Sequence, residues 1–480
     1  MKLSKYIVLF VAGALGLSSC KKEFLDEKPP TALPVTESIK TETDLADAVN
    51  GMYNAMRQYT LFGRDVPVLG DELGDNIYIY GSNSGRYLSE LNLTYINSNA
   101  EASDIWTQGY YAILQANRII YAANSMPTSN AVNQLRGEAY TARALNYLTL
   151  VNFFATPYNT NPNAAGVPLV TTPTFVTGPF IKPSRATVAA VYSKIISDLD
   201  SAYTTMPATV PTIASHAANS EYGSKWAARA LEARAYLYKA DYANAIVAAR
   251  DVVQNGGYTL AAPNAYVAYW ANPAAVSNKT ETIFELALTN QTNNGTSGLD
   301  YIYNQNGYGD AIAYDALYNL YSATDVRKNL FTTYVNKPGA AVVNKYTNVS
   351  NANDKDDIKI IRYSEVLLTL AEAYARTGDN TNAQTYVNMV AKQRDPAFVG
   401  YISTGSQLAD DIVTERRKEL AFEGLRYFDL QRLGLTVTRP AQVNSAPVVN
   451  TFAPDNFRRI LPIPQSETDI NPNIKQNAGY

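Results

Sequence analysis

Through most of the chain, hydrophobic residues recur at the three- and four-residue spacing of amphipathic helices, and polar segments rich in Pro and Gly separate these stretches. Ser103 is of a type that caps helix N-termini, and Trp106 begins an apolar stripe behind it. The pattern predicts helices that begin at Ser103, span Asn130 to Phe154, and run from Ser184 to about Met206. Helix-breaking Pro and Gly are dense over 155–183, where we expect loops. The fold class is therefore predicted to be mainly α.

One sequence pattern, A-Y-x4-D-x2-N-A, occurs twice, over 235–245 and 373–383. In each copy the acidic residue, Asp241 or Asp379, is a suitable N-cap for a second helix, and Gly378 is suited to end the helix before it. Each copy therefore predicts a tetratricopeptide-like pair of antiparallel helices. Such a scaffold needs about three repeats to bury a core, so less regular helices must supply the rest. A generic helical bundle is the alternative.

Between the two copies, residues 264–325 are rich in Asn, Thr, Gly and Tyr, with one strand-like run at Thr282–Leu286. Loops held on a rigid scaffold often carry binding residues, so this region is a candidate for ligand binding. We expect one domain whose parts are, by residue number, a helical scaffold over 44–260 and 357–434, a loop-rich insertion over about 264–356, and a C-terminal tail over 435–480.

The N-terminus has the layout of a secretory signal, with Lys2 and Lys5 ahead of an apolar stretch over 6–16. Leu17, two serines and Cys20 then resemble the bacterial lipobox, which predicts a signal peptide over 1–19 and lipidation of Cys20. Two or more acyl chains make membrane attachment durable, whereas one chain binds only marginally. Residues 20–43 would form a lipidated tether. An ordinary cleaved signal with an incidental Cys is the alternative.

Composition excludes several classes of function. The formal net charge of −3 lacks the basic excess of nucleic-acid-binding proteins. One His and one Cys cannot build a His/Cys zinc site or, once Cys20 is acylated, a Cys–His catalytic pair, although an oxygen-only calcium site remains possible. We expect no cofactor. The chain holds 36 Tyr against 14 Phe, and Tyr offers an apolar face with a hydroxyl, which suits carbohydrate sites.

Two tracts combine aromatic and polar side chains as a sugar-binding site requires, because sugars present C–H faces and hydroxyl rims. The first tract spans 70–92 and the second lies within 264–325, although any single Tyr in them is more often a packing residue. The candidate ligand-binding residues are Asp71, Asp75, Tyr78, Tyr80, Arg86, Tyr87, Trp270, Tyr301, Tyr303 and Tyr308.

A second motif invites an enzymatic interpretation, because Glu415, Glu419 and Glu423 are spaced to share one helical face. Arginines are interleaved with these carboxylates, and ion pairing lowers a carboxyl pKa where a general acid needs it raised. A structural ion-pair network is therefore favoured over catalysis. His216 lies in a Pro-, Ala- and Ser-rich connection, where we expect an incidental surface residue.

Several motifs, taken in order, resemble the SusD/RagB outer-membrane lipoproteins of Bacteroidetes over nearly the whole chain. They are Trp106-x3-Tyr110-x2-Ile113-x2-Ala116-Asn117, Gly166 to Leu169, Glu365 to Leu368 with Ala371 to Ala373, Glu415 to Leu430, Leu461 to Pro464, Asn471-Pro472 and Gln476 to Tyr480. The resemblance implies an α-helical, non-enzymatic protein of tetratricopeptide type. It would cap a TonB-dependent channel and capture nutrient, usually oligosaccharide and sometimes peptide, at the cell surface. Because ligand sites vary within the family, the resemblance predicts the region of the ligand site but not the residues that form it.

Two other classes of function remain open from the sequence. A glycan-cleaving enzyme would need a carboxyl of raised pKa near a second carboxylate in an open cleft. A cell-surface adhesin or scaffold would present a large apolar interface without a small-molecule cleft.

Overall fold

The computed structural model describes residues 38–174, 180–216, 219–271, 280–350 and 356–480. Thr41–Tyr480 form one compact unit. The predicted signal peptide, Cys20 and most of the predicted tether lie outside the described residues. None of the helices in these ranges is long and apolar enough to cross a membrane.

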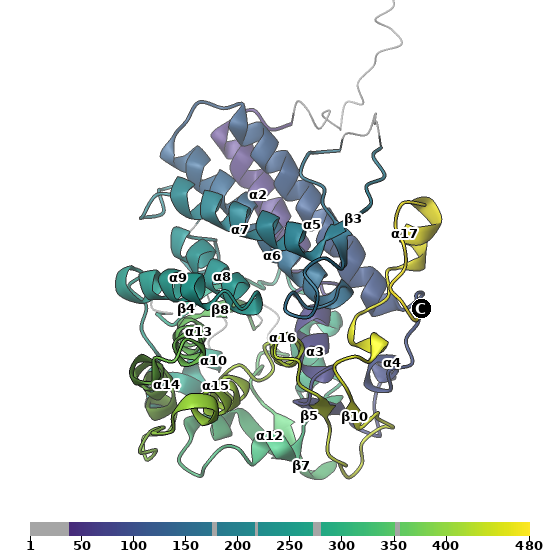
Figure 1. The fold of residues 1–480 in the computed structure, drawn as a ribbon, viewed down its shortest axis with the longest axis vertical. Coiled ribbons are helices and arrows are strands. Elements are labelled where there is room, and N and C mark those ends of the chain that lie inside the picture. Colours follow the sequence, from purple (N-terminus) through teal and green to yellow (C-terminus); the bar gives the residue numbers. More distant parts are fainter. Residues whose placement is uncertain (1–37, 175–179, 217–218, 272–279, 351–355) are drawn as a thin grey trace, which may run out of the picture. The chain divides into compact units, whose positions relative to one another are not determined.

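Helices dominate the unit, which confirms the predicted mainly α fold (Figure 1). The longer helices are α2 (Glu42–Met56), α3 (Asp65–Glu72), α5 (Ala100–Asn124), α6 (Asn130–Phe154), α7 (Val188–Thr205), α8 (Lys225–Tyr238), α9 (Tyr242–Asn255), α13 (Tyr363–Arg376), α14 (Asn380–Arg394) and α15 (Gly405–Glu419). Shorter helices are α4 (Leu88–Leu91), α10 (Tyr266–Ala271), α11 (Leu299–Tyr303), α12 (Asp315–Tyr318), α16 (Arg426–Arg432) and α17 (Gln465–Ile470), with 3-10 turns η2 (Pro263–Ala265), η3 (Gly295–Ser297), η4 (Val326–Leu330) and η5 (Phe457–Arg459).

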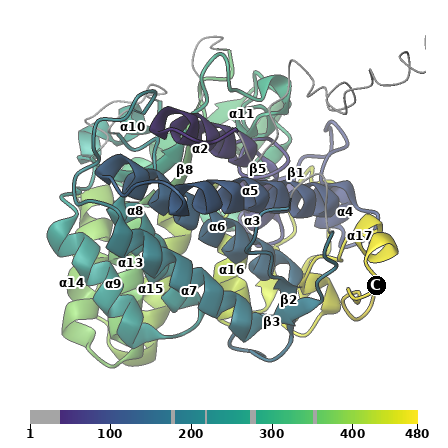
Figure 2. The same ribbon diagram turned by 90° about the horizontal axis from the view of Figure 1, so that it is seen from above.

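The long helices pack in a continuous series. α2 packs on α5, α5 on α6, α6 on α7, α7 on α8 and α8 on α9. α9 then packs directly on α13, which in turn contacts α14 and α15, so the two sequence repeats are neighbours in space although more than a hundred residues separate them. Figure 2 shows α2, α5 and α6 side by side, with α7, α8, α9 and α13 beyond them. This series supplies the additional helix pairs that a tetratricopeptide-like scaffold needs.

Two predicted helix starts were wrong. α5 begins at Ala100, because the Asn99 side chain, not Ser103, accepts the hydrogen bond from the Ala102 amide. α7 begins at Val188 rather than Ser184, because β3 (Arg185–Thr187) pairs with β2 (Ala165–Pro168) before the helix starts. α6 has the predicted limits.

Both copies of the repeat form the predicted helix pairs, α8 with α9 and α13 with α14. Asp241 accepts a hydrogen bond from the Asn244 amide, and Asp379 accepts the equivalent one from the Asn382 amide. The residue before each Asp has a left-handed backbone, Ala240 with φ 58° and Gly378 with φ 87°. The second copy therefore has the residue type that this conformation favours, and the first does not.

The strands form small antiparallel sheets. Besides β2 and β3, they are β1 (Ile77–Ile79), β4 (Thr282–Leu286), β5 (Ala311–Ala313), β6 (Phe331–Tyr334), β7 (Lys337–Val343), β8 (Ile358–Arg362), β9 (Val437–Thr438) and β10 (Thr451–Phe452). The largest sheet has the order β1-β5-β7-β6, and β4, the strand predicted from the sequence, pairs with β8. Pairing of β1 with β5 joins the two tracts that the sequence marked as candidate binding regions.

We expect Ala240→Gly to stabilise the protein by about 0.5–1 kcal/mol, because it relieves a left-handed alanine. The matched variant in the other copy, Gly378→Ala, should destabilise it by about 1 kcal/mol, since a Cβ at Gly378 would meet no atom within 4 Å and only backbone strain is added. Urea unfolding of both variants measures the two effects. Equal changes of the same sign would contradict the interpretation.

Candidate functional site

One face of the β1-β5-β7-β6 sheet carries a separate hydrophobic cluster that is rich in tyrosine. Because side chains alternate along a strand, Tyr78 and Tyr80 of the first tract share this face with Ile312 and Tyr314. Tyr334 packs against the cluster and is half-buried. The Tyr78 and Tyr314 rings lie 5.2 Å apart, and neither hydroxyl has a hydrogen-bond partner among the described residues. Tyr78 and Tyr314 are 0% exposed and Tyr80 is 8% exposed, so the cluster itself is interior and only its rim can contact a ligand. We call the cluster, together with its rim, the tyrosine face.

The rim of the tyrosine face joins the two tracts through side chains. The Arg86 guanidinium stacks over the Tyr308 ring at 4.0 Å and donates a hydrogen bond to its hydroxyl at 3.2 Å. Tyr308 in turn meets the edge of Tyr301 with ring centroids 5.8 Å apart. All three side chains are half-buried, so each has a surface that a ligand can contact. Arg86, Tyr301 and Tyr308 are thus the predicted residues that the fold brings together with part of each side chain exposed.

Two charged residues of the tyrosine face, Asp310 and Lys337, were not predicted from the sequence. Asp310 accepts hydrogen bonds from the Ser84 amide and hydroxyl, and burial raises its pKa. The Lys337 ammonium lies 5.1 Å from the centre of the Tyr80 ring and donates to the Gly309 carbonyl, and burial lowers its pKa. Nothing local in the sequence marks Lys337, because only the pairing of β7 with β5 brings it to this position.

Three predicted candidates from the first tract have structural partners in the interior. Asp71 accepts hydrogen bonds from Asn76 and from the Phe422 and Gly424 amides, and burial raises its pKa to about 6 against these bonds. Asp75 pairs with Arg426 at 2.6 Å. Tyr87 donates to Asp65 at 2.6 Å. These contacts fasten the first tract to the scaffold.

Two candidates from the second tract are also interior. Tyr303 is 0% exposed and stacks on Tyr346 with centroids 5.6 Å apart. Trp270 is 3% exposed and has the cationic groups of Lys345, Lys359 and Arg362 within 3.9–5.1 Å of its ring. Like Tyr78 and Tyr80, neither ring presents a face to solvent, so neither can contact a ligand directly.

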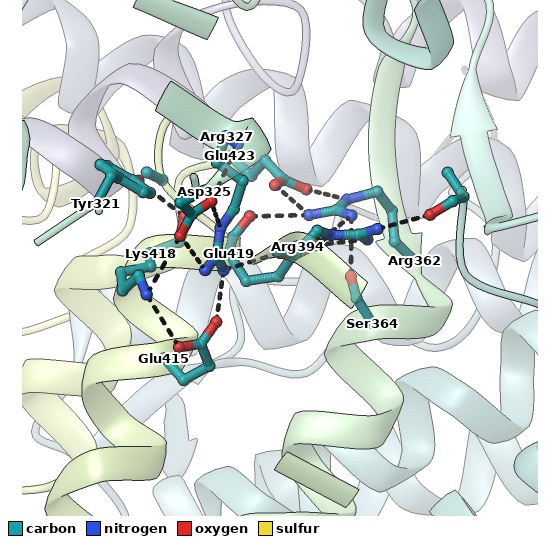
Figure 3. Close-up of polar contacts among 12 residues, drawn as sticks. Tyr321, Asp325, Arg327, Arg362, Ser364, Arg394, Glu415, Lys418, Glu419 and Glu423 are labelled. Carbon is teal, nitrogen blue, oxygen red and sulfur yellow. Dashed lines mark hydrogen bonds and ion pairs between the residues drawn. The ribbon is translucent and has the colours of Figure 1, made fainter. Parts of the chain in front are cut away.

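A buried network of charged residues joins the end of α15 to residues of η4, β8 and α14 (Figure 3). Glu419 at the end of α15 pairs with Arg362 at 2.9 Å, Arg394 at 3.0 Å and Arg327 at 3.1 Å. Arg362 and Arg394 also share Glu281, each at 2.5 Å. The prediction that these carboxylates are ion-paired is thereby confirmed, although Glu423 lies beyond α15 rather than on its face. The expected partners were wrong, because the interleaved Arg416 and Arg417 pair with Asp429 and Asp75 instead.

The network lowers the pKa values of its carboxyl groups, whereas a general acid needs a raised pKa. Burial alone would raise the pKa of Glu419, but Arg394, Arg362 and Arg327 together hold it well below the ordinary value. Against the same effect of burial, Arg327 and Lys418 lower the pKa of Glu415. Arg362 and Lys345 do the same for Glu423, so all three remain ionised.

The prediction for His216 was wrong. Its side chain is fully buried, and its Nε2 lies 3.1 Å from a Glu138 carboxylate oxygen that also accepts from Tyr53 at 2.8 Å. The His216 ring stacks on Tyr222 at 3.8 Å. The connection between α7 and α8 is thus held to the scaffold by an internal histidine. Within the described ranges, no group of three or more His, Cys, Asp or Glu residues is placed to hold a metal ion.

Stacked antiparallel helix pairs define a helical-repeat protein of tetratricopeptide type, and comparisons with known proteins identify its family. The SusD family profile matches residues 326–480, and a profile described as starch-binding associating with outer membrane matches residues 23–237. SusD-like protein P2 of Formosa agariphila is 28% identical, with 100% of each chain covered. The chain belongs to the SusD/RagB family.

Solved structures agree with this assignment. A suspected sugar-binding protein of Bacteroides vulgatus is 29% identical with a TM-score of 0.84, over 92% of this chain and 99% of that chain. A SusD superfamily protein of Bacteroides thetaiotaomicron is likewise 29% identical, with a TM-score of 0.80 over 91% of this chain and 99% of that chain.

We expect Glu419→Gln to destabilise the protein by about 3–5 kcal/mol, because it leaves buried arginines without their shared carboxylate. The matched control is Asp410→Asn on the exposed side of the same helix, which should change stability by no more than about 0.5 kcal/mol. Urea unfolding of the wild type and both variants near neutral pH gives the comparison.

Urea unfolding of the same proteins across a range of pH tests whether the ionised Glu419 carboxylate causes the difference in stability. A carboxyl whose folded-state pKa is depressed stabilises the protein fully above its unfolded pKa, near 4.5, and loses that contribution as pH falls toward the folded value. The stability difference between wild type and Glu419→Gln should therefore shrink below about pH 4.5. A difference that is constant with pH, or equal effects of the two variants, would contradict the network's role.

Proposed function

We propose that this protein is a non-enzymatic nutrient-binding protein and that the tyrosine face binds an oligosaccharide. The single observation that carries the proposal is that Arg86, Tyr301 and Tyr308, which come from two distant tracts, meet with exposed surfaces. A stacked arginine and two tyrosines present flat apolar faces and hydrogen-bonding groups together, and this combination matches a sugar ring. The names of relatives, which describe starch or sugar binding, support the same class of ligand.

Oligosaccharide is favoured over peptide by the balance of charge on this surface. Arg86 and Lys337 lie with Asp310, and the cations already stack on Tyr308 and Tyr80. Both cations therefore act mainly as parts of the aromatic surface rather than as free charges that would select an acidic peptide. A peptide ligand is the alternative that the binding experiment includes.

Binding without catalysis is favoured over glycan cleavage. The three carboxylates that the sequence offered as catalytic candidates are buried in ion pairs and have lowered pKa values, which does not suit a general acid. The adhesin or scaffold alternative lacks a specific supporting observation in the site.

We further propose that Cys20 carries the lipid anchor, that the protein faces the cell exterior at the outer membrane, and that it delivers its ligand to a TonB-dependent channel. The lipobox-like sequence supports the anchor. The family description, which names association with the outer membrane, supports the location. The same family description supports a partner in that membrane.

Replacing Tyr308 with Ala should weaken oligosaccharide binding about fivefold, the equivalent of one lost stacking contact of about 1 kcal/mol. Tyr111→Ala is the matched control, because Tyr111 is an exposed tyrosine on α5. Calorimetry against neutral oligosaccharides and short peptides measures affinity, and chromatography of the incubated ligand checks for cleavage. Equal affinities in both variants would remove the tyrosine face as the site, and cleaved ligand would overturn the non-enzymatic proposal.

Cys20→Ala should release the protein from the membrane fraction, because only acyl chains at this position are expected to hold it there. The wild type, solubilised from native membranes in mild detergent, should co-purify with a TonB-dependent channel. Membrane fractionation and mass spectrometry of the purified complex measure both outcomes. Retention of the variant in the membrane would contradict the anchor, and recovery of the wild type without a channel would contradict the partner.

A further inference from the structure

A pocket of about 380 Å³ lies at one end of the first helix pair, apart from the strands of the tyrosine face. Because α8 and α9 are antiparallel, the first turn of α8 and the end of α9 lie together, opposite the tight turn at Ala240. Trp226 of α8 and Tyr258 after α9 line the pocket, and Ser220 and Thr282 line it from the neighbouring connection and β4. We call it the repeat-end pocket. Its volume falls in the range of small-molecule sites, roughly 300–1,000 Å³.

Comparison of the two repeats explains why this pocket exists. When the copies are aligned on Asp241 and Asp379, Ser224 corresponds to Arg362 and Gly256 corresponds to Arg394. Ser224 and Arg362 both occupy the N-cap of the first helix, and Gly256 and Arg394 both lie at the end of the second.

In the second repeat the two arginines meet on Glu281 and Glu419, so ion-paired side chains occupy that end of the helix pair. In the first repeat the corresponding residues are a serine and a glycine, which lack that bulk. The same position in the scaffold is therefore filled by charge in one repeat and hollow in the other.

The chemistry of the lining selects a class of ligand. None of the thirteen described residues that line the pocket is charged. Anions and cations would lose hydration there without gaining a charged partner, so neither class fits. Two aromatic rings beside the amide group of Asn219 and the hydroxyl of Thr280 offer apolar faces with hydrogen-bonding groups at their edges.

The walls are held in place by interactions that leave the pocket open. Ser220 donates its hydroxyl to Glu285 at 2.7 Å, and its carbonyl accepts from the Glu285 amide at 2.8 Å, which ties the connection to β4. Ser224 caps α8 by accepting from the Ala227 amide at 3.1 Å. On the far side of the same connection, His216 is fixed to Glu138. A pocket with fixed walls loses little conformational entropy when a ligand binds.

We propose that the repeat-end pocket is a second binding site, which takes one ring of a neutral saccharide between Trp226 and Tyr258. The proposal takes its ligand class from the pocket lining and stands independently of whether the tyrosine face binds. A chain with two such sites would hold a long glycan at two points. Holding it at both would increase its overall affinity without any new contact at either site.

The experiment uses Trp226 as its own reporter. Of the three tryptophans in the chain, Trp106 and Trp270 are each 3% exposed, whereas Trp226 is half-buried. Acrylamide quenching of tryptophan fluorescence in the full-length protein therefore reports mainly on Trp226. The probes are maltohexaose, cellohexaose, laminarihexaose and xylohexaose, with a neutral hexapeptide of alanine and serine as the competing class.

At least one hexasaccharide should protect Trp226 from quenching in a saturable manner, and equally so in wild type and Tyr308→Ala. Tyr258→Ala should weaken that protection about fivefold, and Tyr258→Phe should retain most of it, because the phenyl ring keeps the stacking surface. Thermal unfolding checks that each variant is folded. The titration of the wild type tests the proposal even if a variant does not fold.

Three results would overturn the proposal. They are absence of protection by every saccharide, protection by the peptide alone, and protection that is lost in Tyr308→Ala but kept in Tyr258→Ala. The last result would place the saccharide at the tyrosine face, so failure of the pocket and failure of the proposed function remain distinguishable. If Trp226 is protected while calorimetry finds the same saccharide affinity for Tyr308→Ala as for the wild type, the pocket stands and the tyrosine face fails.

Discussion

Burial of charge along residues 415–426 is the constraint on which the rest of this structure depends. An ionised side chain inside a protein costs several kcal/mol unless it is paired, so each buried carboxylate there fixes the position of a cation from another element. Glu415 and Glu419 fix Arg327, which lies just before β6. Glu423 fixes Lys345, just after β7, at 2.7 Å. One short segment therefore holds two strands of the sheet.

The same segment also holds β1, through cations of its own. Arg426 pairs with Asp75 at 2.6 Å, and Arg417 donates to the Asn76 side chain at 3.0 Å, immediately before β1. Ion pairs therefore tie the strands that carry the tyrosine face, in addition to the buried apolar side chains on the other face of these strands, such as Ile77, Ile79 and Val343. Removing one carboxylate should therefore disturb both stability and the geometry of the face.

The sequence predicted best where the physical signal is local. The limits of α6 and the Asp caps at Asp241 and Asp379 follow from helical periodicity and capping, which a few neighbouring residues determine. The carboxylates of the 415–423 motif were correctly expected to be ion-paired, but their arginine partners are Arg327, Arg362 and Arg394 from distant elements rather than the arginines that lie between them. The family followed from motifs in a fixed order.

What could not be predicted depends on contacts between distant residues. β1 and β5 are three residues each, too short for a periodic signal, so their pairing and the position of Lys337 emerge only in three dimensions. Tyrosine suits both cores and binding surfaces, so composition could not separate buried Tyr303 from half-buried Tyr308. His216 was misjudged because its partner Glu138 lies 78 positions away.

The central claim is that two tracts distant in sequence form one ligand-binding face on a rigid helical scaffold. Hydrogen–deuterium exchange with and without a bound neutral oligosaccharide tests it directly, because ligand contact slows exchange of the amides it covers or orders. The account predicts slower exchange at residues 80–87 and 301–310 together, with α5 and α6 unchanged. Slower exchange in only one of these segments, or only in the helical scaffold, would contradict it.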